Sequence, residues 1–400
     1  MKILLVNKYL YPRGGAESYT LALGRLLRER GHETEFFGMA DSRNGVGNRL
    51  GAEVSRLDFS EGMLRNLHAP FRIVYNGEAA RKLNRVLEAF QPDVLHLNNI
   101  QFHLTPSVIL AADRYRRRTG KKLKIVYTAH DYQLVCPGHG LFDGHYRLCE
   151  KCLGGSYLHC VAGKCVKGSR LKSALAALDG AVWRYSQAYK CIDRIICCSA
   201  FLKEKLDTNP VLREKTVVLH NFSEEFSEEK AEKGNYVLQF GHLSREKGTY
   251  TLLEAAKRMP SVRFAFAGRG EAVSEIEKLP NTDYVGFQTG KELETLVRRA
   301  KLTVYPSQWP ENCPLSVIES VSLGTPVVAS RIGGIPELVR SGETGELFEA
   351  GNAVQLEALL RRLLEKPGLL ARYEENCGPS GFETRESYYR KLMKYAYEGL

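Results

Sequence analysis

The sequence predicts an α/β protein made of two doubly wound domains, each with a parallel sheet covered by helices. In residues 302–330 a buried strand, a Pro-rich loop, a helix and a second buried strand follow one another, as in a βαβ unit. Near the N-terminus, a buried strand over residues 3–6 leads into a Gly-Gly loop and a helix. The length of 400 residues exceeds what one core supports and suits two domains.

The composition is that of a globular protein, with 44% hydrophobic and 26% charged residues. No apolar run approaches the length that spans a bilayer. The apolar run at the N-terminus is short and charged residues follow it too soon for a secretory signal, so we expect a cytoplasmic protein. Ten cysteines in such a chain argue against a disulfide framework.

The positive charge is concentrated in the first half of the chain. Residues 1–210 hold 32 Lys and Arg against 19 Asp and Glu, a net charge of +13, whereas residues 211–400 hold 25 against 27, a net charge of −2. A basic half indicates an anionic lipid, phosphate or nucleic acid nearby, and the alternative is a solvated basic surface. We favour a membrane or a lipid phosphate.

In the first half, apolar patterns predict alternating strands and helices. The expected strands are 34–37, 92–99, 124–129 and 192–198, and the expected helices are 18–30, 77–90, 105–118 and 169–190. Residues 40–75 are less regular and are expected to face an acceptor. The helix 169–190 places Leu171, Leu175, Leu178 and Val182 on one face, which fits either an ordinary surface helix or one that lies on lipid.

The second half begins after an acidic, strand-poor linker at residues 223–230. Strands are expected at 236–240, 262–267 and 284–287, and helices at 250–259 and 291–300. Beyond residue 351 the chain is expected to be helical, over 353–366, 368–375 and 383–398.

A cysteine-rich insert covers residues 136–165. The set Cys149, Cys152, Cys160 and Cys165 can supply four thiolates to one zinc ion, with Cys136 or His139 as alternates. Such a site would be structural, because an all-thiolate set leaves no open position for catalysis. The alternatives are five reduced thiols or an iron–sulfur cluster.

Two carboxylates frame the loop and helix that follow the strand at 302–305. Glu311 precedes the helix, and Glu319 lies about two turns along it. Helix N-termini beyond the carboxyl ends of strands suit phosphates, and carboxylates there accept hydrogen bonds from hydroxyl groups. A nucleotide-sugar has both kinds of group. The alternative for either residue alone is an ordinary solvated acid.

The same stretch resembles the retaining glycosyltransferases of family 4, which have the GT-B fold. The matching residues are Pro306-Ser307, Glu311-Asn312, Glu319, Gly324 to Ala329 and Gly333 to Glu337. The resemblance implies two Rossmann-like domains that face each other across a cleft. The expected acceptor-binding domain is 1–215 with the insert 136–165, the nucleotide-sugar domain is 216–380, and a helix at 381–400 crosses back to the first domain.

The resemblance also assigns roles to individual residues. The catalytic set would be Glu311 on sugar hydroxyls, Lys247 on the diphosphate, and His130 as a hydrogen-bond partner of sugar or phosphate rather than a general base. Glu319 would bind the ribose. The family has an Arg where this chain has His242, so either Arg245 replaces that cation or His242 donates one hydrogen bond. The remaining substrate-binding residues would be Gly14, Gly15, Gly268, Phe287, Asn312, Pro314 and Leu315.

The function that the resemblance implies is hexosyl transfer with retention of configuration. The donor would be a UDP- or GDP-sugar, and the acceptor a glycan or polyprenyl-linked molecule in surface polysaccharide biosynthesis, at the cytoplasmic face of the inner membrane. No Asp-x-Asp motif is present to hold a magnesium-bound diphosphate, so we expect catalysis without a metal cofactor.

Two rival functions remain at the level of the sequence. A zinc-containing nucleic-acid-binding protein would use the cysteines and the basic half, but the basic residues are scattered and no base-reading helix follows the cysteines, so we expect no nucleic-acid partner. A GT-B-like nucleotide-sugar epimerase or hydrolase would need an acid or base pair to activate water, which the sequence does not reveal.

Overall fold

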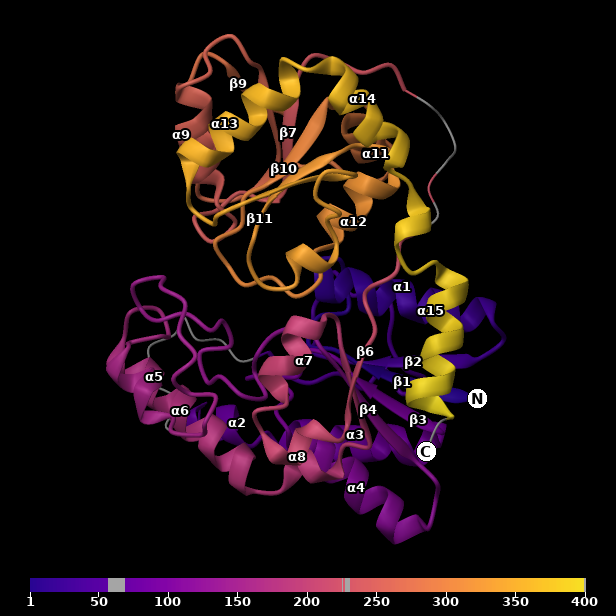
Figure 1. Cartoon of the computed structure of the whole chain (residues 1–400). Coiled ribbons are helices and arrows are strands. Elements are labelled where there is room, and N and C mark those ends of the chain that lie inside the picture. The colour runs from indigo at the N-terminus through magenta and orange to yellow at the C-terminus, as the bar shows by residue number, and fades with distance from the viewer. Residues whose placement is uncertain (57–68, 225, 227–230, 399–400) are drawn as a thin grey trace. The chain divides into compact units, whose positions relative to one another are not determined.

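The computed structural model describes residues 1–56, 69–224, 226 and 231–398 (Figure 1). The chain divides into two units, one formed by Met1–Leu219 with Tyr389–Leu400 and the other by His220–Tyr388. Residues 57–68 of the segment expected to face an acceptor, and residues 225 and 227–230 of the expected linker, lie outside the described residues. The predicted α/β fold with two parallel sheets is confirmed.

The described residues of the first unit form a six-stranded parallel sheet in the order β2-β1-β3-β4-β5-β6. Its strands are apolar along most of their length, as expected where helices cover both faces. They are β1 Lys2–Val6, β2 Glu33–Phe37, β3 Val94–Leu97, β4 Lys124–Ala129, β5 Arg194–Cys197 and β6 Thr216–Val218.

Helices α3 and α4 cover one face of this sheet, and their apolar sides join the largest core cluster. Helix α3 begins where the side chain of Asn76 accepts hydrogen bonds from the amides of Glu78 and Ala79, and it ends at Gln91 in the left-handed region. The α-helices of this unit are α1 Gly15–Glu29, α2 Ala69–Val74, α3 Gly77–Phe90, α4 Ser107–Thr119, α5 Leu158–Ala162, α6 Arg170–Tyr185, α7 Ala200–Leu206 and α8 Pro210–Arg213, with a 3₁₀ turn at Ala188–Cys191.

The second unit also contains a six-stranded parallel sheet within its described residues, in the order β12-β11-β10-β7-β8-β9. Read from β9, this is the order 3-2-1-4-5-6 of doubly wound nucleotide-binding folds. The strands are β7 Val237–His242, β8 Phe264–Arg269, β9 Thr282–Tyr284, β10 Leu302–Tyr305, β11 Val327–Ser330 and β12 Gly345–Phe348.

Helices flank this second sheet on both sides, with α9 and α13 on one side and α11 and α12 on the other (Figure 1). The α-helices of the unit are α9 Thr249–Lys257, α10 Val273–Ile276, α11 Gly290–Arg299, α12 Leu315–Ser322, α13 Ala353–Leu364 and α14 Pro367–Asn376, with 3₁₀ turns at Ile335–Glu337 and Pro379–Gly381. None of the helices in the described part of the chain is both long enough and apolar enough to cross a membrane.

The last helix, α15 Arg385–Leu392, continues as a π-helical turn over Met393–Tyr397. Its final residues belong to the first unit, where the Tyr397 hydroxyl lies 2.6 Å from Nδ1 of His96 on β3. The other ring nitrogen of His96 lies 2.7 Å from the Thr128 hydroxyl on β4. Lys124 Nζ also donates to the Tyr397 carbonyl at 2.6 Å. These buried bonds hold the end of the chain against the first sheet.

Several sequence-based boundaries need correction. The chain divides at 219/220 rather than 215/216, because β6, which the expected boundary assigned to the second domain, pairs with β5 of the first sheet. The helix expected to reach residue 190 ends at Tyr185, since Gln187 adopts a left-handed φ of 67°. The strand expected at 284–287 is the shorter β9, so Phe287 follows it in a loop. Strand β12 was not predicted.

The buried histidine His96 predicts a pH dependence of folding. Burial, together with the charge that His130 would carry, lowers the pKa of His96 to about 3. Below the unfolded pKa of about 6.5, the unfolded chain binds a proton at this ring and the native chain does not. The contribution of His96 to the free energy of unfolding is therefore fully present above pH 6.5 and decreases as the pH falls. Between pH 6.5 and 5, His96 alone should lower the free energy of unfolding by about 2 kcal/mol.

Urea denaturation of wild type, His96→Gln and the exposed control His145→Gln at several pH values tests this expectation. We expect a shallower pH slope for His96→Gln than for the other two proteins, whatever its absolute stability. Identical slopes in all three proteins would contradict the assignment.

Candidate functional site

The candidate donor site lies where the strand order of the second sheet reverses. Strands β7 and β10 are neighbours there, and the chain leaves them in opposite directions across the sheet. The loops after these strands, residues 243–248 and 306–314, therefore meet beyond the carboxyl edge of the sheet, where open α/β sheets bind ligands. Lys247 lies in the first loop and Glu311 in the second.

Lys247 and Glu311 form an ion pair at the meeting point of the two loops. Lys247 Nζ lies 2.5 Å from Glu311 Oε1. The hydroxyl groups of Ser307 and Tyr305 donate to the same oxygen at 3.0 and 3.1 Å. The Glu311 side chain is nearly buried, yet no described residue donates to its other oxygen, Oε2. The carboxylate is thus fixed by three donors on one oxygen and retains a second oxygen that can accept from a ligand hydroxyl.

Close backbone contacts fix the two loops to each other. The Glu246 carbonyl accepts hydrogen bonds from the amides of Gln308 and Trp309 at 2.9 and 3.1 Å. Gly248 has a φ of +71°, and a Cβ atom there would lie 1.7 Å from the Pro306 carbonyl oxygen. Only glycine permits this approach, so the sequence pair Lys247-Gly248 is explained by the packing of the loops.

The turn after β11 supports Glu311 from the other side. Gly333 has a φ of +61°, and a Cβ atom there would lie 2.2 Å from the Glu311 carbonyl oxygen. The amide of Gly334 donates to that carbonyl at 2.6 Å. The Gly-Gly pair found in the sequence therefore positions the backbone of Glu311.

Helix α12 places Glu319 about one turn beyond its start at Leu315, rather than the two turns expected from the sequence. Burial raises the pKa of Glu319 to about 7, and the negative charge of Glu224 adds to the rise. The helix begins at Leu315, directly after Pro314, and Asn312 is buried in the loop before it. The structure therefore brings Glu311, Asn312, Pro314 and Leu315 to the start of the helix and Glu319 to its body.

A histidine and an arginine lie at the carboxyl ends of β7 and β8. His242, where the family has an Arg, is exposed at the end of β7 and is paired in register with Arg269 of β8. Gly268 allows β8 to approach β7, because a Cβ atom there would lie 1.8 Å from the Gly241 carbonyl oxygen. The Arg269 guanidinium lies 4.3 Å from the ring centre of the exposed Phe287.

Arg269 was missed by the sequence reasoning, although it stands inside the motif Gly268-Arg269-Gly270. It offers a cation at the register position of His242, whereas Arg245 is exposed in the next loop and its guanidinium lies over the Tyr250 ring. The pairing of β7 with β8 was the missing information, since it alone places Arg269 beside His242.

A second group of predicted residues lies at the carboxyl edge of the first sheet. Gly14 precedes α1 with extended backbone, and Gly15 is the first residue of that helix. His130 follows β4, and its Nε2 lies 3.0 Å from Oδ1 of Asn98, which follows β3. Burial lowers the pKa of His130 to about 3, so the ring is neutral at physiological pH. An imidazole with so low a pKa is a weak base, so this ring suits hydrogen bonding more than proton abstraction.

The first sheet also places several polar residues near His130 that the sequence reasoning missed. Lys8 follows β1, and its pKa is lowered by burial against the opposing effects of Glu17 and Asp131. Asp131 accepts a hydrogen bond from Gln101 at 3.1 Å. The strand order 2-1-3 places the loops after β1 and β3 side by side, as the 2.8 Å bond from the Lys8 amide to the Asn99 carbonyl shows. A polar residue directly after each buried strand was the available signal.

The cysteines of the insert come together around α5 and α6. Burial raises the pKa of Cys152 to about 12, and the neighbouring thiols Cys136, Cys149 and Cys165 add to the rise. Cys152 and Cys160 share one apolar cluster with Tyr157 and Ala177. In the described part of the chain, however, no three His, Cys, Asp or Glu side chains are arranged to hold a metal ion. We therefore derive no role for a metal, and the zinc site stays a prediction for metal analysis of the purified protein.

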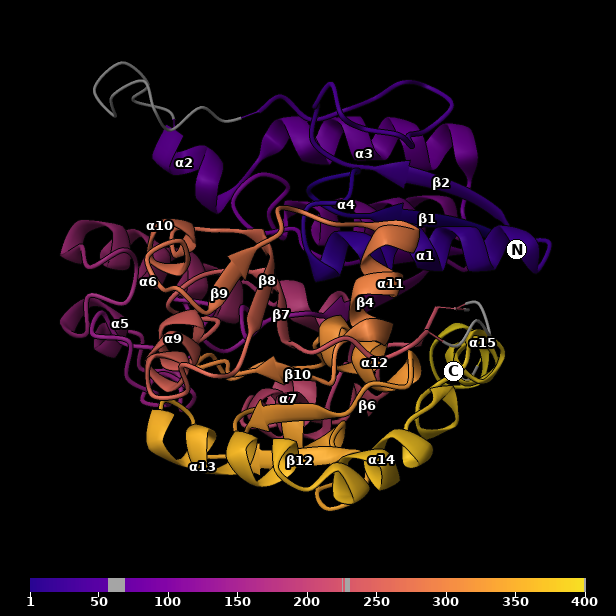
Figure 2. The same ribbon diagram turned by 90° about the horizontal axis from the view of Figure 1, so that it is seen from above.

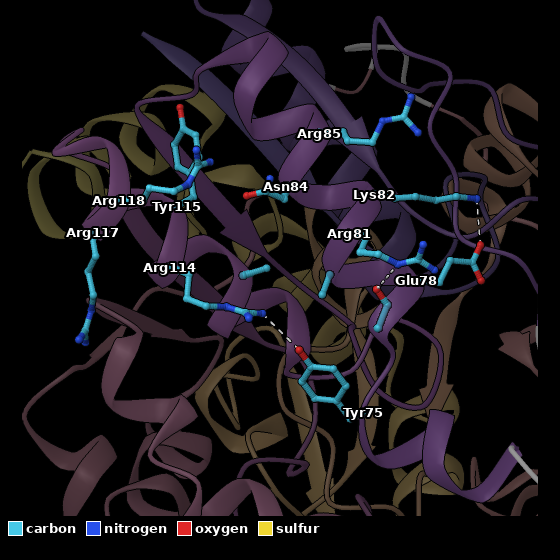
Figure 3. A pocket seen from close by; sticks show the side chains of 13 residues that line it. Tyr75, Glu78, Arg81, Lys82, Asn84, Arg85, Arg114, Tyr115, Arg117 and Arg118 are labelled. Carbon is cyan, nitrogen blue, oxygen red and sulfur yellow. Dashed lines mark hydrogen bonds and ion pairs between the residues drawn. The ribbon is translucent and has the colours of Figure 1, made fainter.

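A large pocket of the first unit lies apart from these predicted site residues. It has a volume of about 1100 Å³ and is formed by α3, α4 and Tyr75 (Figure 3). Six of its lining side chains are cationic: Arg81, Lys82, Arg85, Arg114, Arg117 and Arg118. None of the predicted catalytic or donor-binding residues lines it.

Comparison with known families accounts for nearly the whole chain. The family described as Glycosyltransferase Family 4 matches residues 13–223, and the family described as Glycosyl transferases group 1 matches residues 221–378. An uncharacterised glycosyltransferase of Methanocaldococcus jannaschii is 25% identical over 309 residues, which cover 71% of this chain and 85% of the relative.

Two solved structures share the fold over essentially the full length. Anabaena HepE, crystallised with UDP and also with UDP-glucose, superimposes with a TM-score of 0.68 in its UDP complex at 18% identity, covering 98% of this chain and 99% of HepE. The lipopolysaccharide outer core galactosyltransferase WaaB superimposes with a TM-score of 0.61 at 15% identity, covering all of both chains. At these identities the likeness supports the fold.

The contact between Gly248 and Pro306 predicts an unequal response of two glycines. Gly248→Ala should lower the free energy of unfolding by about 3 kcal/mol, because the new Cβ atom overlaps the Pro306 carbonyl. Gly342→Ala should cost only about 1 kcal/mol, because Gly342 has a similar φ of +83° with nothing near its Cβ position. Denaturant titration of both variants measures the difference. Equal losses would show that conformation alone, and not loop contact, requires glycine at residue 248.

Proposed function

The chain belongs to glycosyltransferase family 4, and from that premise we propose that it transfers a sugar from a nucleoside diphosphate sugar to an acceptor hydroxyl. The observation that carries the proposal is the Lys247–Glu311 pair at the point where the strand order of the second sheet reverses. A cation for a diphosphate and a carboxylate for sugar hydroxyls meet there, at the start of helix α12.

The second unit has a candidate binding residue for each part of a nucleotide-sugar. Glu319 on α12 is proposed to accept hydrogen bonds from the ribose, and the backbone near Phe287 to hold the base. Lys247, together with Arg269 or His242, is proposed to bind the diphosphate, while Oε2 of Glu311 accepts from the sugar. The UDP and UDP-glucose complexes of the structurally similar HepE support UDP as the first donor to test, and GDP-sugars are the alternative.

The proposed reaction requires stabilisation of negative charge on the leaving group. An acceptor oxygen forms a bond to the anomeric carbon as the bond from that carbon to the diphosphate breaks. Lys247 and the free amides at the start of α12 offset the charge that develops on the diphosphate, which allows transfer without a divalent metal. We propose attack from the face that the diphosphate leaves, with the acceptor proton passing to a diphosphate oxygen, so that configuration is retained.

The first unit is proposed to bind the acceptor. Gly14 and Gly15 at the start of α1 and the neutral His130 lie at one edge of its sheet, together with Lys8 and Asp131. A neutral His130 can donate one hydrogen bond to a sugar or phosphate oxygen, which matches the role that the sequence suggested. The structural likeness to a lipopolysaccharide galactosyltransferase supports hexosyl transfer to a surface glycan or its lipid-linked precursor as the setting.

Separate roles for Lys247 and Glu311 predict two different binding defects. Lys247→Met should weaken binding of UDP and UDP-glucose alike, by at least about tenfold, since both carry the diphosphate. Glu311→Gln should leave UDP affinity nearly unchanged and weaken UDP-glucose, because only the latter has sugar hydroxyls. Each change should lower turnover by roughly 100-fold or more. Isothermal titration with both ligands, and transfer assays with the donor that a thermal-shift panel of UDP- and GDP-sugars selects, measure these effects.

Matched controls come from exposed charges of helix α9. Lys257→Met and Glu254→Gln remove the members of an exposed ion pair on the same unit, and both should behave as wild type. If Glu311→Gln weakened UDP as much as UDP-glucose, the assignment of Glu311 to the sugar would fail. Unchanged turnover in Lys247→Met would remove Lys247 from the diphosphate site.

The raised pKa of Glu319 predicts that donor binding strengthens with pH. With a pKa of about 7, Glu319 is mostly protonated at pH 6 and mostly ionised at pH 8, and only the ionised form accepts hydrogen bonds through both oxygens. Affinity for UDP-glucose should therefore rise by about tenfold between these pH values. UDP-glucose is the suitable ligand, since its phosphates do not titrate in this range. Glu319→Gln should show no such rise, and a rise of the same size in that variant would exclude Glu319 as its source.

A further inference from the structure

Helix α6 of the first unit carries a line of exposed apolar side chains. Leu171, Leu175, Leu178, Val182 and Tyr185 are spaced by four, three, four and three residues, which places them on one side of the helix. Leu171, Leu178 and Tyr185 are 64%, 56% and 69% exposed, Val182 is 37% exposed and Leu175 is half-buried. We call this set the α6 stripe.

The opposite side of α6 is apolar as well, and it is already covered. Ala176, Ala177 and Trp183 are buried against the first unit. A helix that is apolar on both sides is normally enclosed on both, so the α6 stripe indicates a surface that another body covers. The neighbouring helix α5, which packs beside α6 (Figure 2), adds Leu158 at 77% exposure.

The charges in the sequence segment that contains the α6 stripe are almost all positive. Residues 151–190 contain seven Lys and Arg and a single acid, Asp179. Asp179 is buried and accepts a hydrogen bond from the Trp183 indole at 2.9 Å, and burial raises its pKa to about 7. At the beginning of α6, Arg170 and Lys172 are exposed beside Leu171. The exposed charge of this segment is therefore cationic.

We propose that the α6 stripe is a docking surface for an anionic lipid bilayer. Apolar side chains along one side of a helix, bordered by Lys and Arg, insert at the boundary between headgroups and acyl chains while the cations meet lipid phosphates. A second copy of this chain is a poorer occupant, because pairing two such segments would bring like charges together. The proposal is independent of the donor site.

The cationic groove between α3 and α4 adjoins the same helix. Tyr75, which lines the groove (Figure 3), stacks on Trp183 of α6, and the ring centres lie 6.4 Å apart. Within the described residues, Arg81, Arg85 and Arg114 have no carboxylate partner, and Arg114 instead donates to the Tyr75 hydroxyl at 3.2 Å. These guanidinium groups add to the positive charge of the first unit, although Trp183 lies on the side of α6 opposite the stripe, so the proposal does not depend on the groove.

Sedimentation with lipid vesicles tests the proposal on the full chain. Wild type should bind vesicles of phosphatidylglycerol mixed with phosphatidylcholine and should bind phosphatidylcholine vesicles much more weakly. Raising NaCl from about 0.1 to about 0.5 M should weaken the binding, since exposed charges are screened. The double variant Leu171→Gln/Leu178→Gln should lose at least about tenfold in vesicle affinity while keeping the melting temperature of wild type, because both leucines are exposed.

A matched control removes an exposed apolar residue elsewhere. Val354 on α13 of the second unit is 57% exposed, and Val354→Gln should bind vesicles as wild type does. The proposal is overturned if the Leu171/Leu178 variant binds anionic vesicles as tightly as wild type, or if wild type fails to bind them. It is also overturned if light scattering shows a wild-type dimer that the double variant abolishes, since the α6 stripe would then be an interface between copies of the chain.

Discussion

The structure of the second unit depends on one topological constraint, the reversal of strand order between β7 and β10. Parallel strands whose connections run to opposite faces leave a crevice at their carboxyl edge, and the loops after the two strands must meet there. Lys247 and Glu311 are 64 residues apart in the chain, but this reversal brings them into contact. Gly248 and Gly333 then hold the loops at a distance that a side chain would prevent. The ion pair is the chemical consequence of the sheet order.

The pair also fixes the orientation of a carboxylate beside the proposed binding site for an anion. Three donors converge on one oxygen of Glu311, and the nearest of them is a cation. No donor to the Glu319 carboxylate lies in the described part of the chain, and burial raises its pKa to about 7. Two glutamates eight positions apart therefore have different electrostatic environments. Their separate roles in the proposed reaction follow from this difference, because three donors already hold one carboxylate and the other can gain hydrogen bonds from a ligand.

Local pattern was sufficient for the elements that surround the site. Strands β10, β11 and β4 and helix α3 were predicted to the residue, because short apolar runs or a periodic stretch ended at Gly, Pro or a capping Asn. What the sequence did not reveal was contact between distant segments. Strand β6 was assigned to the second domain, because only its pairing with β5 shows that it belongs to the first sheet. Arg269 became a candidate ligand only through the register of β7 with β8. In both cases the prediction failed because it needed a contact between strands that are distant in the sequence, and local secondary-structure propensity does not reveal such contacts.

The two halves of the chain differ in how they could attract an anion, one through a few placed cations and the other through its net positive charge. The half that holds the proposed donor site has a net charge of −2, so attraction for a diphosphate must come from a few placed groups such as Lys247 and Arg269. Local cations allow a charged product to leave, whereas a strongly positive unit would retain it.

The first half has a net charge of +13, and part of it surrounds the α6 stripe and the groove between α3 and α4. A general positive field is useful for holding an extended anionic surface, and an apolar helix face beside it fits the boundary of a membrane. In the sequence, the amphipathic pattern of α6 fits either an ordinary surface helix or a helix that lies on lipid. The exposure of its apolar side chains in the structure favours the second interpretation.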